Sequence, residues 1–148
     1  MNLEKVINGG HVLYIGLDSM PNPTVASTLA GIWLADLANI AGRRYNLGLS
    51  ALNSKRISLF IDEVSNVINV PLIEILNKGA ESGIQTTCAM QTIADLAHRM
   101  GSVEAAHVVL GNLNNLIALR TKDQMTQNFV VETLGNTYIA NQSLTINN

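Results

Sequence analysis

Two carboxylates, an amide and a cation stand directly after short apolar runs of this sequence: Asp62, Glu63, Gln91 and Arg120. A further carboxylate, Asp18, follows the first apolar run. Because ligands bind at the carboxyl ends of parallel strands, side chains placed just after such strands meet at one edge of a sheet. There, one carboxylate can hold Mg²⁺ and a second can activate water, while an amide and a cation contact a γ-phosphate. The set therefore suits a phosphate and metal site.

The sharpest of these patterns is ISLFIDE, residues 57–63, an apolar strand that ends in Asp62 and Glu63. It matches the Walker B pattern of P-loop ATPases, in which the Asp holds Mg²⁺, usually through a water, and the Glu polarises the attacking water. A strand that merely ends in acidic turn residues has the same letters, so both interpretations stay open. The phosphate-binding loop G-x-x-x-x-G-K-[ST] does not occur, and the sequence has no Gly-Lys dipeptide. We therefore expect this chain alone to be inactive as an ATPase.

Apolar runs alternate with helix-length segments along the chain. This order indicates βαβ units and an α/β fold, with a mainly parallel sheet and helices on both of its faces. The expected strands are residues 11–17, 57–61, 84–90, 116–119 and 137–140. The expected helices are residues 24–44, 71–80, 92–100, 102–111 and 126–134. The first of these helices is apolar all round, which predicts burial on more than one side.

The composition describes a folded domain with little surface charge. Hydrophobic residues make up 47% of the chain and charged residues 14%, against about 25% charged in a typical domain. These values exclude an intrinsically disordered chain and predict that a partner or further chain covers part of the surface. The net charge of −2 excludes a nucleic-acid binder that acts through overall basicity. Arg43, Arg44 and Tyr45 either touch DNA phosphates locally, or the two arginines place favourable charge at a helix C-terminus.

The cysteine count and the hydropathy of the sequence indicate the redox environment of the chain and whether it crosses a membrane. The single cysteine, Cys88, excludes an internal disulfide and fits a reducing environment. No run of 18 uncharged apolar residues occurs, and the nearest candidate, residues 25–41, is interrupted by Asp36 and Asn39. We therefore expect no membrane-spanning segment in this chain.

The motifs, taken in order, resemble the conjugative coupling proteins of the TraD/TraG type. In that family a G-R-x-x-G turn follows Walker B and leads into a strand ending in A-x-Q-[ST]; residues 78–96 are similar to this segment. LRTKD, residues 119–123, resembles the later R-T-x-D element, and the opening strand with its alanine-rich helix resembles the stretch before Walker B. The resemblance covers nearly the whole chain. It implies that residues 1–148 are one partial RecA-like ATPase domain, in which residues 141–148 form a frayed tail.

The resemblance implies a RecA-like, mainly parallel sheet that lacks its N-terminal P-loop unit. It also implies a motor on the cytoplasmic face of the bacterial inner membrane, which links a relaxase–DNA complex to a type IV secretion channel. Members move single-stranded DNA as homo-hexamers, with ATP and Mg²⁺ as cofactors of the intact protein. Matched residue by residue, Asp62 would serve Mg²⁺, Glu63 would be the general base and Gln91 would sense the γ-phosphate. Arg120 would be a further catalytic cation.

One position departs from the family pattern. The arginine of the turn before the third expected strand is Ala80 here, after Gly79. If that arginine acts on the neighbouring subunit, its role falls to another cation, and Lys78 and Arg120 are the candidates. Two other readings of the chain remain: a stand-alone, non-catalytic RecA-like interaction module that has lost its P-loop, and an unrelated α/β enzyme that uses other metal chemistry.

A different chemistry is conceivable at Cys88, which could act as a nucleophile with His98 or His107 as its base. We expect instead a buried structural cysteine, because mid-strand cysteines behave as small hydrophobic residues. The two histidines have no Cys or His partner at metal-ligand spacing, so we predict no zinc site.

Overall fold

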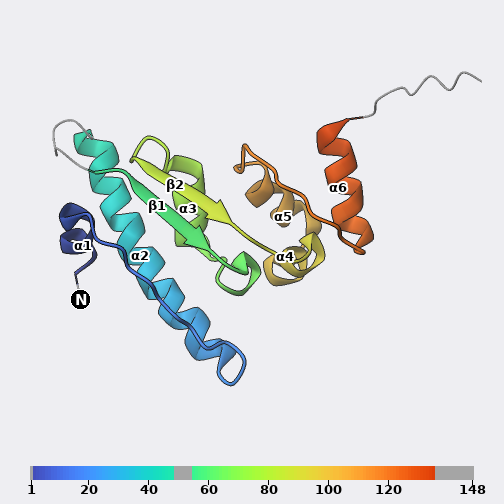
Figure 1. Cartoon of the computed structure of the whole chain (residues 1–148), viewed down its shortest axis with the longest axis horizontal. Coiled ribbons are helices and arrows are strands. Elements are labelled where there is room, and N and C mark those ends of the chain that lie inside the picture. Colours follow the sequence, from blue (N-terminus) through green and yellow to red (C-terminus); the bar gives the residue numbers. More distant parts are fainter. Residues whose placement is uncertain (1, 49–54, 136–148) are drawn as a thin grey trace, which may run out of the picture.

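The computed structural model describes residues 2–48 and 55–135 (Figure 1). Its elements are α1 (Leu3–Gly9), α2 (Pro23–Leu47), β1 (Ile57–Ile61), the 3-10 helix η1 (Val64–Asn66), α3 (Val70–Lys78), β2 (Ile84–Cys88), α4 (Ile93–Met100), α5 (Val103–Leu110) and α6 (Gln124–Leu134). The five helices predicted from the sequence correspond to α2 to α6. The mixture of helices with a parallel strand pair is compatible with the predicted α/β class.

The sheet of the described residues consists of β1 and β2, which pair in parallel. The register runs from Ile57 opposite Ile84 to Ile61 opposite Cys88. The connection through η1 and α3 makes this a βαβ unit, as predicted. Side chains of β1 alternate between half-buried and exposed, and Phe60 is 75% exposed. One face of the strand pair is therefore covered and the other is open.

Helices α2 and α3 lie side by side on the covered face (Figure 1). Leu34, Leu37 and Ile40 of α2 meet Leu72 and Ile75 of α3 in the buried cluster. The inward-facing side chains of β1 pack against the same cluster. The expectation of helices on both faces is wrong for the described residues, since the outward face of the strands carries no helix.

Helix α2 begins at a proline, whose missing N–H is not needed in the first turn. Its buried residues follow one stripe at spacings of three or four. Outside this stripe, Val25, Leu29 and Ile32 are exposed. The prediction of burial on more than one side is therefore wrong for the chain as described, where one stripe alone is covered.

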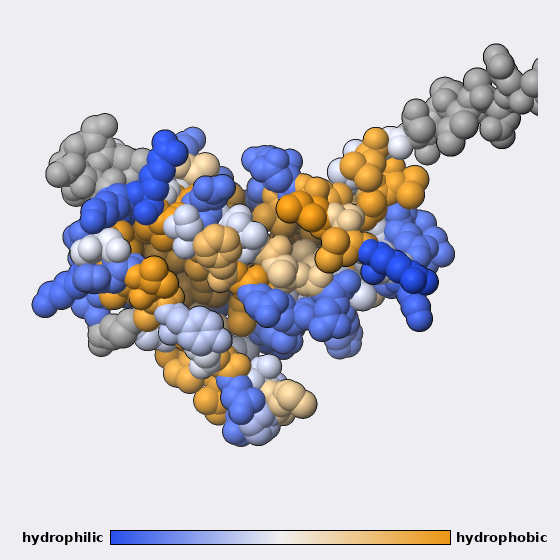
Figure 2. Space-filling view, viewed as in Figure 1, coloured by the Kyte–Doolittle hydropathy of each residue, from blue (hydrophilic) through white to orange (hydrophobic). Residues whose placement is uncertain are grey.

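By length and composition, α2 is long and apolar enough to cross a membrane. This is a weak indication, since core helices of soluble proteins pass the same test. The absence of a membrane-spanning segment stays a prediction. Other apolar side chains also reach the surface, and Figure 2 shows such a patch at the upper end of α6.

Two predicted strands are not formed. Residues 11–17 and 116–119 carry no regular secondary structure, and Val12 is 97% and Ile117 91% exposed. A strand needs a neighbour for its backbone N–H and C=O groups, and the sheet described here supplies none to either segment. The predicted strand 137–140 and the tail 141–148 lie outside the described residues.

Buried hydrogen bonds of two polar side chains join the end of α2 to the turn before β2. Ser82 is 1% exposed, and its hydroxyl donates to the carbonyl of Ala41 at 2.9 Å. Arg44, also buried, donates through Nη1 to the carbonyls of Lys55 at 3.0 Å and Ser82 at 3.4 Å. Burial lowers the pKa of its guanidinium. Arg44 is thus structural, and the interpretation of this residue as a DNA-phosphate contact is wrong.

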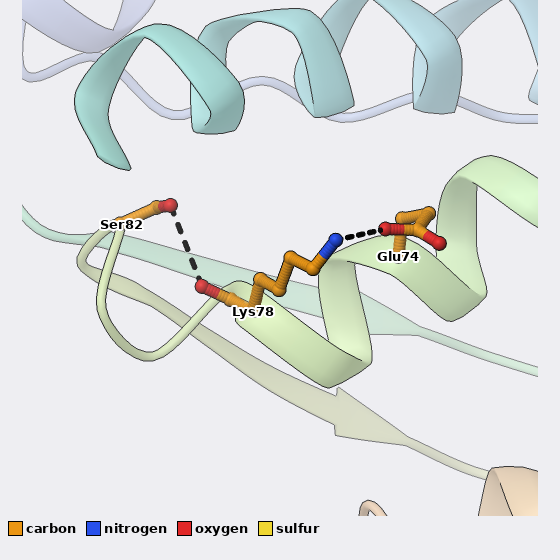
Figure 3. A network of polar contacts seen from close by, with 3 residues as sticks. All are labelled: Glu74, Lys78 and Ser82. Carbon is orange, nitrogen blue, oxygen red and sulfur yellow. Dashed lines mark hydrogen bonds and ion pairs between the residues drawn. The ribbon is translucent and has the colours of Figure 1, made fainter. Parts of the chain in front are cut away.

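The same turn closes back on α3. The Ser82 hydroxyl donates to the Lys78 carbonyl at 3.4 Å, and the Lys78 ammonium is bonded to Glu74 at 2.9 Å (Figure 3). The bond to Glu74 raises the pKa of Lys78. Lys78 is therefore held by a carboxylate of its own helix.

Candidate functional site

The carboxyl ends of β1 and β2 are joined by the backbone that follows them. The N–H of Ala89 donates to the carbonyl of Ile61 at 2.8 Å, and the N–H of Val64 donates to the carbonyl of Ala89 at 2.9 Å. These bonds hold the turn at Asp62 and Glu63 beside the segment that leads to Gln91. The sequence-based expectation that these residues share one edge of the sheet is met.

Glu63 is held in an unusual backbone conformation. Its φ of 52° and ψ of 63° lie in the left-handed region, and no other non-glycine residue among those described has a positive φ. For an L-amino acid this conformation costs roughly 1–2 kcal/mol. Such outliers persist where surrounding bonds enforce them, and they gather at functional sites. The conformation therefore marks Glu63 as the centre of the candidate site.

Both carboxylate oxygens of Glu63 are engaged. The Ser65 hydroxyl donates to Oε1 at 2.7 Å, and the Gln91 amide donates from Nε2 to Oε2 at 2.9 Å. Ser65 is buried, whereas Gln91 is exposed. One partner thus anchors the carboxylate from within the fold, while the other reaches it from the solvent side. The structure brings together two of the predicted site residues and adds Ser65, which the sequence analysis missed.

Asp62 lies on the same turn and is exposed. It forms no hydrogen bond or ion pair with another described residue, so its oxygens are open to a hydrated cation. Mg²⁺ keeps several waters and is bound by one or two carboxylates together with substrate phosphates. One open carboxylate fits that role. Across the described ranges, no group of three Asp, Glu, His or Cys side chains forms a complete metal site.

Arg120 is not bonded to this group. It is exposed, and among the described residues no hydrogen bond or ion pair joins it to Glu63 or Gln91. The rest of its motif caps α6: the Asp123 carboxylate accepts the N–H of Thr126 at 2.8 Å, and the Thr121 hydroxyl oxygen accepts the N–H of Asp123 at 3.2 Å. The capping pattern, Asp three residues before Thr at a helix start, was readable in the sequence but was not used there.

Asp18 does not follow a strand of the structure. It sits in an exposed stretch just before a turn at residues 19–21, since the strand expected to precede it is not formed. Its placement at a strand end was wrong.

Cys88 lies half-buried in β2, where burial raises the pKa of its thiol to about 11. The thiol is thus protonated at neutral pH, which agrees with a structural cysteine rather than a nucleophile. His98 is exposed, and the His107 ring meets Phe129 edge-on with centroids 5.9 Å apart. Neither histidine is bonded to the thiol among the described side chains.

These features define a parallel βαβ unit whose joined strand ends carry a carboxylate–amide pair. A family model described as the TraM recognition site of TraD and TraG matches residues 56–147, from one residue before β1 onward. This range spans more than half of the chain, and the chain therefore belongs to that family: it is C-terminal sequence of a TraD/TraG-type coupling protein. No significant match was found among curated proteins or among solved structures.

Proposed function

We propose that this chain is part of the ATPase motor domain of a conjugative coupling protein, and that its sheet is the Walker B half of a RecA-like fold. The observation that carries the proposal is the 2.9 Å bond from Gln91 Nε2 to Glu63 Oε2, made by a Glu63 with a left-handed backbone. A positioned base and an amide at the carboxyl ends of parallel strands suit the hydrolysis of a bound nucleotide.

Each residue has a defined task in this proposal. Bound ATP and Mg²⁺ supply the γ-phosphate and the positive charge beside it. Asp62 would hold the ion, and Glu63 would take the proton of the attacking water while Ser65 keeps the Glu63 carboxylate oriented. Gln91 keeps one hydrogen of its amide on Glu63 and directs the other to the γ-phosphate. Arg120 contributes a positive charge once the intact protein brings it to the site.

The proposed partners rest on the family resemblance. The family description names TraM, and we propose that the matched region takes part in recognising it. In the intact protein this chain belongs to a homo-hexamer at the cytoplasmic face of the inner membrane, which moves single-stranded DNA from a relaxase towards a type IV secretion channel. The low charged fraction and the exposed apolar side chains support a surface that other protein covers.

A second candidate function is a non-catalytic module that only binds TraM. The absence of a phosphate-binding loop from the 148 residues and the Ala80 substitution favour it. It requires no strained base at the strand ends, and for this reason we place it second.

The experiment that separates the two is Glu63→Gln in the intact coupling protein. Loss of a general base slows turnover by about 10²–10⁴-fold, while nucleotide binding is expected to stay at the wild-type level because Asp62 is untouched. Steady-state phosphate release and nucleotide titration measure the two properties.

The matched control is Glu74→Gln, which neutralises an exposed carboxylate whose one ion pair lies on the surface of α3. It is expected to leave turnover unchanged. Wild-type turnover in Glu63→Gln would remove Glu63 as the base and leave the binding module as the better account.

A further inference from the structure

Thr126 forms a hydrogen-bonded bridge between the starts of two helices. Its hydroxyl oxygen accepts the N–H of Ile93, the first residue of α4, at 2.9 Å. The same hydroxyl donates its proton to the carboxylate of Asp123, the N-cap of α6, at 2.7 Å. Ile93 and Thr126 are 33 residues apart in the sequence, and this side chain joins the two helix starts.

The bridge has a fixed direction. An ionised carboxylate is acceptor-only, so the single proton of the Thr126 hydroxyl must point to Asp123. A lone pair of the oxygen is then left for Ile93. The N–H of Ile93 is one of the donors at a helix start that have no partner within the helix. Thr92 satisfies the N–H of Asp95 through its own hydroxyl at 3.0 Å, which leaves the N–H of Ile93 to Thr126.

Gln91 stands two residues before Ile93, in the short link between β2 and α4. One end of this link is fixed by the backbone bonds of Ala89 to Ile61 and Val64. The other end is fixed by the bond from Ile93 to Thr126. The position of the Gln91 amide against Glu63 therefore depends on both anchors, and the second one is supplied by α6.

We propose that Thr126 is a positioning residue that holds Gln91 against Glu63 through the start of α4. The inference rests on the function proposed above, because it gives Gln91 a task in the site. It also gives the R-T-x-D element a role: Asp123 orients the Thr126 hydroxyl that fixes the A-x-Q-T element.

The first test is made on the chain itself, without nucleotide, with Thr126→Val. Valine has the shape of threonine but no hydroxyl, so the N–H of Ile93 loses its acceptor. The amide hydrogen of Ile93 is expected to exchange at least about tenfold faster, and the two side-chain amide proton signals of Gln91 are expected to move towards those of free glutamine. Nuclear magnetic resonance measures both.

Two variants provide the comparison. Thr126→Ser retains the hydroxyl and is expected to restore both readouts to their wild-type values. Thr133→Val makes the same change at an exposed threonine of the same helix and is expected to alter neither readout. If Thr126→Val does not fold, Thr126→Ala replaces it, because water can then reach Ile93 without linking it to α6. Gln91 signals that stay at their wild-type positions in a folded variant without the hydroxyl overturn the proposal.

The second test measures ATP turnover by the intact protein that carries Thr126→Val. This variant keeps Gln91 but removes one anchor of its position. We therefore expect kcat for ATP to fall about threefold to tenfold, the scale of one neutral hydrogen bond, while KM stays unchanged. The two proposals fail separately. Wild-type turnover in Glu63→Gln overturns the role of Glu63 as the base, whereas an unchanged Gln91 signal in Thr126→Val overturns the positioning role alone.

Discussion

Glu63 combines a strained backbone, which lowers the stability of the fold, with a hydrogen-bonded carboxylate, which raises it. The left-handed backbone costs free energy, while the bonds from Ser65 and Gln91 return part of it. A residue chosen for stability alone would be glycine, which adopts this conformation without a steric penalty. A glutamate at a position where glycine would be less strained indicates that the side chain is kept for function.

We predict that Glu63→Gly is more stable than Glu63→Ala by about 1 kcal/mol. Both variants lose the carboxylate and its two bonds, so their difference isolates the backbone strain, which alanine retains and glycine relieves. The free energy of unfolding, measured by urea denaturation of each variant, gives this difference.

The control is the same pair of substitutions at Asp62, which has no positive φ. There, glycine is expected to be no more stable than alanine, because its greater freedom in the unfolded chain favours unfolding. An alanine variant at position 63 as stable as the glycine variant would contradict the strain.

The pairing of Glu63 with Gln91 was predictable because it depends on strand order and length alone. A parallel βαβ unit brings the residues after two neighbouring strands to one edge, whatever the details of the turns. The bonds of Ser65 and Thr126 were not predictable, since each depends on the direction of one hydroxyl within a turn. Arg120 was grouped with the site because an apolar run precedes it, and that run does not form a strand.

At the scale of elements, the presence of a neighbouring strand separates the strands that were predicted correctly from those that were not. Residues 57–61 and 84–88 pair with each other, so their apolar pattern finds hydrogen-bond partners. Residues 11–17 and 116–119 have a similar pattern but no strand beside them among the described residues. Helices satisfy their own backbone bonds, and all five predicted ones are therefore present within a few residues of the expected ends.

Helix α6 depends on its cap more than the other helices, because none of its residues is fully buried. The bonds from the Thr126 hydroxyl and backbone N–H lower the pKa of the Asp123 carboxyl. A carboxyl whose pKa is lower in the folded state stabilises the fold above its unfolded pKa of about 3.9. That contribution is lost as the pH falls through the folded value.

We therefore predict that the first turn of α6 is fully formed above about pH 4 and loosens below it. The Cα chemical shifts of residues 124–127, followed from pH 7 to pH 2, measure this change. Asp123→Asn keeps a capping oxygen but does not titrate, so its α6 is expected to respond less to acid. Equal acid responses in the two proteins would mean that the cap does not govern this turn.

At the scale of the whole molecule, the described residues leave apolar surface exposed to solvent. Its strand pair is covered on one face, Phe60 is exposed on the other, and apolar side chains of α2 and α6 reach the surface. Parallel sheets are ordinarily covered on both faces. The residues proposed as the base, the amide and the Mg²⁺ ligand stand at the strand ends, and no phosphate-binding loop occurs among the 148 residues.

We predict that the purified chain releases no phosphate from ATP above background, with or without Mg²⁺ and single-stranded DNA. Glu63 can take a proton only from a water in line with a held γ-phosphate, and without a P-loop or its lysine nothing in this sequence holds that phosphate. Phosphate release is measured with Glu63→Gln as the matched control, because a contaminating ATPase gives equal rates in both proteins. Mg²⁺-dependent turnover that Glu63→Gln abolishes would show that these residues bind and hydrolyse the nucleotide without a P-loop. Equal background rates, together with a turnover in the intact protein that depends on Glu63, would assign the base to this chain and the phosphate cradle to sequence outside it.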